Sequence, residues 1–195
     1  MPKAEDRREI RDVRVLAALA HPVRTALLSH LMAVGPRTAS ECARAVGASP
    51  SNCSWHLRHL ARFGLVERVE AGSGGRDADG RERPWRATAT GFSFAPAGDP
   101  AGRAARQALA SVQLEESDRL ARGYLRGEDD VPDEWREAAA LSAYGLLLDA
   151  GELRELTERL DALIRPYIAM TREEAPPDAR PVHLALTAFL RPEEA

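Results

Sequence analysis

The stretch TASECARAVGASPSNCSWHLRHLARFGLV, residues 38–66, decides the fold, because it predicts two short helices, a tight turn and a following strand. Thr38 starts the first helix, and Gly47 stands where that helix stops. Ser49 is the expected N-cap of the second helix, and Pro50 occupies its first position, where a missing N–H group costs nothing. The pattern is that of a helix-turn-helix.

The second helix has two different faces. Cys53, Leu57 and Leu60 are spaced four and three residues apart, so they share an inner stripe that would face a core. The opposite face offers hydroxyl, amide, indole and guanidinium groups, which suit phosphates and base edges in a DNA major groove. The residues predicted to bind DNA from this helix are Ser49, Ser51, Asn52, Ser54, Trp55, Arg58 and Arg62. The alternative is an ordinary helical pair whose polar face is only solvated.

The segment before this motif predicts further helices. VLAALAHPVRTALLSHL, residues 15–31, supplies two helical stretches interrupted at His21-Pro22. Their apolar side chains can cover the inner stripe, so three or four short helices can close one small core.

The segment after the motif predicts a β-hairpin wing. Residues 65–69 and 85–90 alternate apolar and polar side chains, and a Gly-, Asp- and Arg-rich stretch separates them. The arginines of this wing are expected to meet phosphates or an adjacent minor groove. They are Arg76, Arg81, Arg83 and Arg86. The alternative is a charged loop with no role beyond solubility.

Residues 12–91 resemble the winged helix-turn-helix of the ArsR-type bacterial transcriptional regulators. LAHPVRTALLSHL resembles the opening helices of that family, and SNCSWHLRHLARFGLVERV resembles its recognition helix and first wing strand. The sequences GASPSNCSWHLRHLARFG and GRERPWR are most similar to those of an actinobacterial branch of the family that has an additional C-terminal domain. The resemblance implies a homodimer that occupies promoter DNA and usually represses until an effector binds.

One departure from the family concerns metals. Metal-sensing members carry two cysteines on the helix before the recognition helix, and Thr38 and Ser40 stand at those positions here. Neither supplies a thiolate, so the sequence predicts no soft-metal site. Cys42 and Cys53 fall on inward stripes, where small buried hydrophobes are expected, with redox sensing as the alternative.

The five histidines do not form a metal motif either. His56 and His59 are three apart on the recognition helix, while His21, His30 and His183 are scattered. Zinc needs three or four converging ligands, and no His-Glu-x-x-His or paired Cys-x-x-Cys tract occurs. We expect no metal and no cofactor, and we expect His56 to pack or to contact a phosphate.

Charge is divided between the two parts of the chain. The formal total over 195 residues is −3. Residues 1–96 carry 15 Lys and Arg against 10 Asp and Glu, a net +5, so residues 97–195 carry 12 against 20, a net −8. The basic part holds the helix-turn-helix, which suits a phosphate backbone. No phosphate-binding loop, nucleophile elbow or catalytic spacing is found in the sequence, so an enzyme is not expected.

Residues 97–195 predict a second region with mixed structure. We expect a helix from about residue 103 to 126, assigned to the dimer interface by the resemblance, although it could pack only on its own chain. The apolar run 139–148 is compatible with a buried strand or a helix, and we favour the strand; residues 152–170 are predicted as a helix that Pro166 kinks or ends, and 182–190, which alternate, as a second strand. Two strands and one helix are too few for an independent sheet. A pocket near Trp135, Tyr144, Tyr167 and Phe189 could hold an effector.

Together these patterns predict a mostly α protein with α+β features. Residues 1–96 would form the DNA-binding domain, and residues 97–195 a region for dimerisation or effector binding. The expected function is a promoter-binding transcriptional repressor that acts as a homodimer on double-stranded DNA through recognition helix 49–62 and wing 65–90. Alternatives are a small-molecule-responsive regulator and a winged-helix module that binds protein. With two cysteines and no long apolar run, we expect a cytoplasmic protein with no membrane association.

Overall fold

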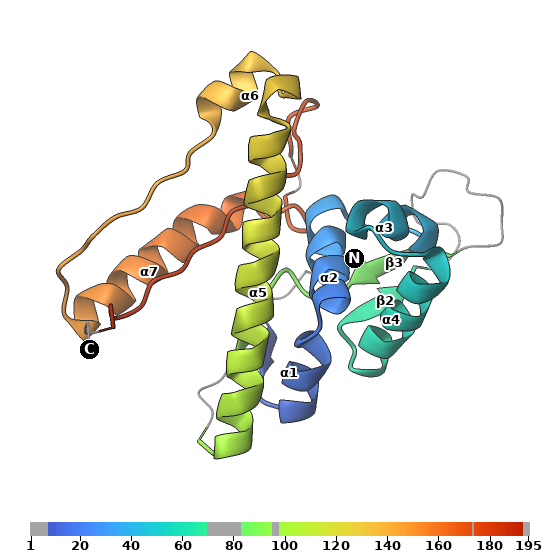
Figure 1. Ribbon diagram of the computed structural model, residues 1–195, viewed down its shortest axis with the longest axis horizontal. Coiled ribbons are helices and arrows are strands. Elements are labelled where there is room, and N and C mark those ends of the chain that lie inside the picture. The colour runs from blue at the N-terminus through green and yellow to red at the C-terminus, as the bar shows by residue number, and fades with distance from the viewer. Residues whose placement is uncertain (1–7, 70–82, 95–97, 173, 193–195) are drawn as a thin grey trace. The chain divides into compact units, whose positions relative to one another are not determined.

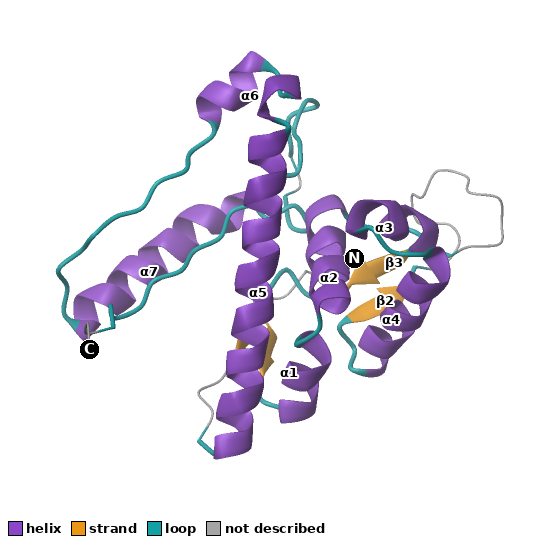
Figure 2. Ribbon diagram, in the orientation of Figure 1, coloured by secondary structure: helices purple, strands orange, loops and turns teal. Residues whose placement is uncertain are grey.

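The computed structural model describes residues 8–69, 83–94, 98–172 and 174–192. Figure 1 shows the order of the elements, and Figure 2 shows that most of them are helices. The chain divides into two compact units, which we treat separately. Unit 1 comprises Met1–Glu116 and Ile168–Val182, and unit 2 comprises Ser117–Tyr167 and His183–Ala195. The mostly α fold class, with a small antiparallel sheet, is confirmed.

Unit 1 begins with two helices separated by a sharp break. α1 spans Val13–Leu19, with Asp12 as its N-cap, and α2 spans Pro22–Val34. Pro22 is the first residue of α2 and His21 is its N-cap, so the interruption predicted at His21-Pro22 is confirmed. The two helices are bent by 89° relative to each other. Their buried faces can therefore line two sides of one core.

The helix-turn-helix follows directly. α3 spans Ala39–Val46 and α4 spans Pro50–Arg62. Gly47 ends α3 with φ of 67°, in the left-handed region that favours glycine. Thr38 and Ser49 cap the two helices through their side chains, as the sequence predicted. These caps fix the turn that orients α4.

The wing strands pack behind α4. β2 spans Val66–Arg68 and β3 spans Trp85–Ala87, and they pair antiparallel with Glu67 opposite Arg86. The predicted strands were longer, at residues 65–69 and 85–90, because alternation continues beyond the ladder. The tip between the strands, with Arg76 and Arg81, lies outside the described residues.

A second pair of strands was not predicted. β1, Arg8–Ile10, pairs in parallel with β4, Phe92–Phe94. The guanidinium of Arg8 also donates a hydrogen bond of 2.7 Å from Nη1 to the carbonyl oxygen of Gly64. The N-terminal segment is highly charged and showed no strand pattern, yet it forms a strand that pairs with β4.

One hydrophobic core holds unit 1 together. The side chains of α2, α3, α4 and both wing strands meet in it, and the first part of α5 adds Leu109. The largest members with almost no solvent exposure are Leu27, Leu31, Leu57, Leu60, Leu65, Leu109 and Val66. Burying a leucine contributes about 1.5–3 kcal/mol, so this cluster is the main source of stability in unit 1.

The remaining elements lie in or lead to unit 2. α5 spans Pro100–Arg126 and begins three residues before the predicted start. The short elements η1, Glu128–Asp130, and α6, Asp133–Ala138, follow, and then α7, Ala150–Ile164. η2, Arg165–Tyr167, replaces the last turn of the helix predicted to reach residue 170, as expected from Pro166.

The two strands predicted in this region are wrong for the single chain. Residues 139–148 and 182–190 are extended and exposed, with no strand assigned. The apolar run of residues 139–148 and the alternation of residues 182–190 indicated burial in a sheet, but neither segment has a partner strand within the described part of the chain. Among the described residues, no single helix has the length and apolarity to span a membrane, and only α1 and α2 taken together as a bent pair meet that test.

Candidate DNA-binding surface

The outward side of α4 is free in unit 1. Ser51, Asn52, Trp55, Arg58 and Arg62 are all exposed. The three residues predicted for the opposite stripe, Cys53, Leu57 and Leu60, have no exposed surface. One helix therefore separates an apolar side, which anchors it, from a polar side, which is available to a ligand.

Hydroxyl groups organise the start of α4. The Ser49 side chain accepts a hydrogen bond from the backbone N–H of Asn52 at 3.2 Å, and it lies 3.2 Å from the Ser51 hydroxyl. One turn further on, Arg58 Nη1 donates to Ser54 Oγ at 2.9 Å. Ser54 is half-buried, so the position of its hydroxyl helps to fix the direction of the Arg58 guanidinium.

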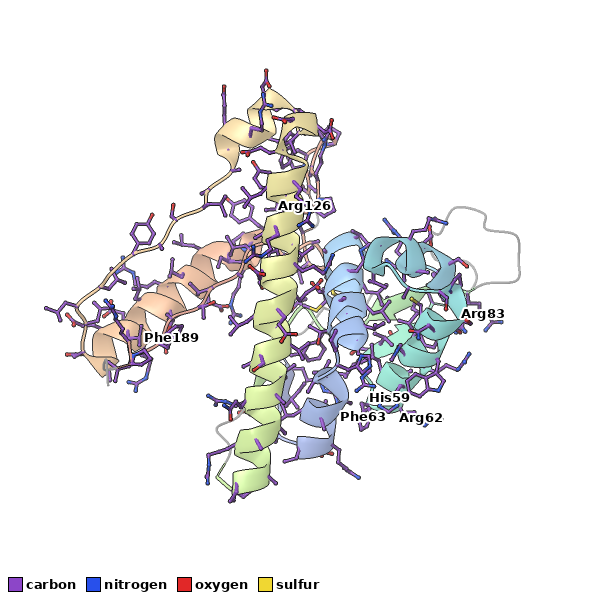
Figure 3. All side chains as sticks on the ribbon, viewed as in Figure 1. His59, Arg62, Phe63, Arg83, Arg126 and Phe189 are labelled. Carbon is purple, nitrogen blue, oxygen red and sulfur yellow. The ribbon has the colours of Figure 1, made fainter. Side chains whose placement is uncertain are left out.

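Trp55 is the one large apolar side chain on this polar side. It is 55% exposed, although a tryptophan in a monomer usually covers more of its ring. The indole stacks on the His59 ring, with ring centroids 5.7 Å apart and planes at 16°. The His59 ring in turn meets Phe63 edge-on at 5.4 Å. Figure 3 shows His59, Arg62 and Phe63 together at the C-terminal end of α4. These ring contacts hold the indole against the helix.

His56 lies beneath this row of rings and not on the surface. It is 4% exposed, and its ring centroid is 4.6 Å from that of His21. Desolvation lowers the pKa of His56 to about 4, and the guanidinium of Arg24 and the neighbouring imidazoles of His21 and His59 disfavour a second positive charge there. Burial also lowers the pKa of His21. Of the two roles expected for His56, the structure therefore supports packing, and both rings are neutral near pH 7.

The wing places one arginine in an ion pair and leaves another at the surface. Arg86 contacts Glu67 across the strand pair, with a shortest nitrogen–oxygen distance of 2.6 Å. The Arg83 side chain is exposed, and Figure 3 places it apart from the His59 end of α4. To contact a phosphate, Arg86 must either break its ion pair with Glu67 or bind while that pair is kept.

Sequence reasoning missed Arg68 as a candidate. This residue lies on β2, with its guanidinium carbon 4.2 Å from the centroid of the Trp85 ring. Its Nη1 also donates to the backbone carbonyl of Arg83 at 2.8 Å. Arg68 lies in the alternating stretch 65–69, where charged side chains are expected on the solvent side, so the pattern alone gave it no special role. The structure makes it an exposed cation held in place at the base of the wing.

The residues considered for metal binding have other contacts. Thr38 is the N-cap of α3: its hydroxyl accepts from the backbone of Glu41 at 3.2 Å, and the Glu41 carboxylate accepts from the Thr38 backbone at 2.7 Å. Cys42 and Cys53 are fully buried, as expected for small hydrophobes, and burial raises the pKa of Cys42 to about 12. In the described part of the chain, no three His, Cys, Asp or Glu side chains converge as metal ligands.

Comparisons with known proteins agree with this geometry in one region. Residues 19–69 match the family model of a helix-turn-helix domain. This range contains the end of α1, the whole of α2, α3 and α4, and the first wing strand. No curated protein matches the chain.

Several solved structures are similar to the chain. A winged helix-turn-helix DNA-binding domain from Mycobacterium bovis, described as homodimeric and as a possible ArsR-family regulator, shares 27% identity. It covers 55% of this chain and 79% of that one, with a TM-score of 0.32. A possible transcriptional regulator for arsenical resistance shares 29% identity, covering 55% of this chain and 94% of that one, with a TM-score of 0.31. A probable regulator from Pseudomonas aeruginosa shares 18%, covering 77% and 89%, with a TM-score of 0.32.

The helix-turn-helix match ends at residue 69, and the antiparallel pair β2 and β3 supplies the wing next to it. The chain therefore carries a helix-turn-helix domain over residues 19–69, with the strand pair β2 and β3 as its wing.

Proposed function

We propose that the protein is a sequence-specific repressor that binds promoter DNA as a homodimer, with α4 in the major groove and the wing on the flanking backbone. The observation that carries this proposal is the exposed polar side of α4, opposite a fully buried apolar stripe. The major groove of B-DNA is wide enough for an α-helix, and the free polar side of α4 would face the base edges there. The protein has no catalytic role in this proposal, and it acts in the cytoplasm.

The chemistry of α4 divides along its length. The N-terminal end, with the Ser49 and Ser51 hydroxyls and the Asn52 amide at the positive end of the helix dipole, is suited to a phosphate. The second turn presents Trp55 and Arg58 to base edges. An arginine pairs best with guanine, and an indole can pack on the 5-methyl group of thymine.

The wing arginines complete the contact by charge. Arg83 and Arg86 of the described residues, with Arg68 added, would neutralise backbone phosphates beside the helix. Arg76 and Arg81 keep the role predicted for them from sequence. Because phosphates carry no base identity, these side chains would set affinity and register more than sequence preference.

Homodimerisation and regulation extend the proposal beyond the winged helix. The similar Mycobacterium bovis domain is described as homodimeric, and the family resemblance places the dimer contact on the helix after the wing, here α5. An effector bound to residues 97–195 would change the spacing of the two α4 helices. A coupling of about 1–3 kcal/mol is enough to change the affinity for the promoter about 5- to 150-fold.

The test is binding of the full chain to DNA fragments selected in vitro, measured by fluorescence anisotropy at several salt concentrations. Arg58→Ala should weaken binding by about 1–3 kcal/mol if the guanidinium contacts a base. Arg159→Ala is the matched control, because Arg159 is an exposed helical arginine in unit 2 that pairs with Glu155 at 3.7 Å. We expect that control to bind as the wild type does.

Two results would contradict the proposal. Unchanged affinity of Arg58→Ala with an intact circular dichroism spectrum would remove this residue from the contact set. No salt-dependent affinity for any duplex would favour the alternative in which the winged helix binds a protein.

A further inference from the structure

Unit 2 has no core of its own. In its described part, residues 117–167 and 183–192, every side chain is exposed or partly exposed, and none is buried. α6 and α7 each bury no residue, although α7 carries leucines at helical spacing. Without a buried core, the hydrophobic free energy gained by unit 2 is too small to offset the conformational entropy that the chain loses on folding. Its apolar surface must therefore be completed by something else.

The unfilled apolar surface is concentrated in two extended segments, residues 141–148 and 184–190. Tyr144 is 81% exposed, Leu147 fully exposed and Leu190 90% exposed. Phe189, labelled in Figure 3, also projects from the second segment and is exposed. Monomeric proteins rarely expose contiguous apolar surface of this extent, and patches of this kind mark sites of protein association.

Both segments have the composition of β-strands without a partner. Neither contains Asp, Glu, Lys or Arg, and Leu184, Leu186 and Leu190 lie on one side of the second segment. α7, Ala150–Ile164, lies between the segments in sequence, which is the order of a strand, a crossover helix and a second, parallel strand. A sheet of two such strands is too small to be stable alone.

Outside residues 139–148 and 182–190, the described part of the chain exposes fewer large hydrophobic side chains. They are Trp55, on the proposed DNA side, Leu114, Leu125, Leu163 and Tyr167. By contrast, a second copy of the chain presents the same two uncharged apolar segments. A two-fold interface uses the same patch on both chains, and these segments carry no like charges that would oppose such pairing.

We infer that residues 139–148 and 182–190 form strands of one sheet with the same segments of a second copy, so that the two C-terminal units fold together across the dimer. This inference rests on the homodimer of the proposed function and places a second interface in unit 2. Apart from Phe189, which is on the other side of its segment from Leu186 and Leu190, nine large side chains of the segments are at least 40% exposed. At roughly 80 Å² each, they would bury about 1,400 Å² over both chains, within the range of a stable interface.

The experiment measures the oligomeric state of the full chain by sedimentation equilibrium. Leu147→Lys and Leu186→Lys each place a charge in the proposed sheet core, so we expect the dimer dissociation constant to rise roughly 100-fold or more. Thr187→Lys is the matched control, because it adds the same charge on the other side of the same strand and should leave the dimer close to that of the wild type. Leu147→Ala, which adds no charge, should raise the constant about tenfold.

A further variant separates this inference from the proposed function. Leu114→Lys alters the exposed side of α5, which the family resemblance assigns to the dimer. Should Leu114→Lys dissociate the dimer while both unit 2 lysine variants remain dimeric, the C-terminal sheet is refuted and the homodimer stands. A wild-type chain that is monomeric at micromolar concentration refutes both. Wild-type helix content in the variants, seen by circular dichroism, shows that any dissociation is not due to unfolding.

Discussion

At the scale of single residues, Trp55 combines features that a buried or merely solvated side chain would not show. Its indole is more than half exposed, yet the His59 ring stacks on it and the His56 ring meets it edge-on at 4.8 Å. Both rings lie on the same helix, so the indole is held before any ligand arrives. A side chain that is ordered in advance loses less entropy on binding.

We therefore expect Trp55→Ala to weaken binding to the selected DNA, because the variant loses a contact with the 5-methyl group of a thymine. Replacing a contacted thymine with deoxyuridine removes one methyl group and should cost the wild type about 0.8 kcal/mol, or about fourfold in affinity. The same replacement should cost Trp55→Ala nothing. A double-mutant cycle of protein and DNA measures this coupling. Equal losses in both proteins would assign the indole to another contact.

His56 makes the stability of unit 1 depend on pH. Its pKa is about 4 in the folded chain and near its ordinary value of 6.5 in the unfolded chain. Between these values the unfolded chain binds a proton that the folded chain does not, so stability present above pH 6.5 is lost as the pH falls to 4. The loss can reach about 3 kcal/mol. The lowered pKa values of His21 and His59 act in the same direction.

The corresponding experiment is urea unfolding at pH 7 and at pH 4.5. The wild type should lose more stability on acidification than His56→Gln, which has no imidazole to protonate. The difference between the two losses isolates this residue from the many carboxylates that titrate in the same range. Equal acid losses would show that His56 is protonated in the folded state without cost.

At the scale of elements, the caps of the helix-turn-helix are local and can be tested one at a time. Thr38→Ala removes the hydroxyl that accepts from the Glu41 backbone and donates to the Glu41 carboxylate at 2.9 Å. We expect a loss of about 1 kcal/mol in the free energy of unfolding. Ser40→Ala, in the first turn of the same helix, should change it by only a few tenths. A loss in Ser40→Ala as large as that in Thr38→Ala would show that the cap is not the source.

The same contrast between local and distant contacts explains what the sequence could predict. Thr38, Gly47 and Ser49 mark helix ends by contacts with residues a few positions away, so α3 and α4 were predicted almost to the residue. The pairing of β1 with β4 depends on residues more than 80 positions apart, in strands of three residues, and left no periodic signal.

The candidate site follows the same rule. The exposed side of α4 could be derived from helical spacing, because its buried stripe is a property of one helix. The stacking of Trp55 on His59 could have been suspected from their four-residue spacing, but the contact of Arg68 with Trp85 needed the hairpin itself. Residues 139–148 were assigned as a strand from an apolar run and residues 182–190 from alternation, and neither pattern says whether a partner strand is in the same chain.

At the scale of the whole molecule, two copies of α4 can bind one duplex only if the spacing of the half-sites matches the spacing of the helices. We expect the DNA selected by the protein to contain an inverted repeat, with half-site centres about 10 base pairs or a multiple of this apart. Inserting about five base pairs between the half-sites turns one of them to the opposite side of the duplex. Affinity should then fall to that of a single half-site, while inserting about ten pairs should restore part of it. Affinity that is indifferent to spacing would mean that each chain binds alone, and the homodimer would then have no part in recognising the promoter.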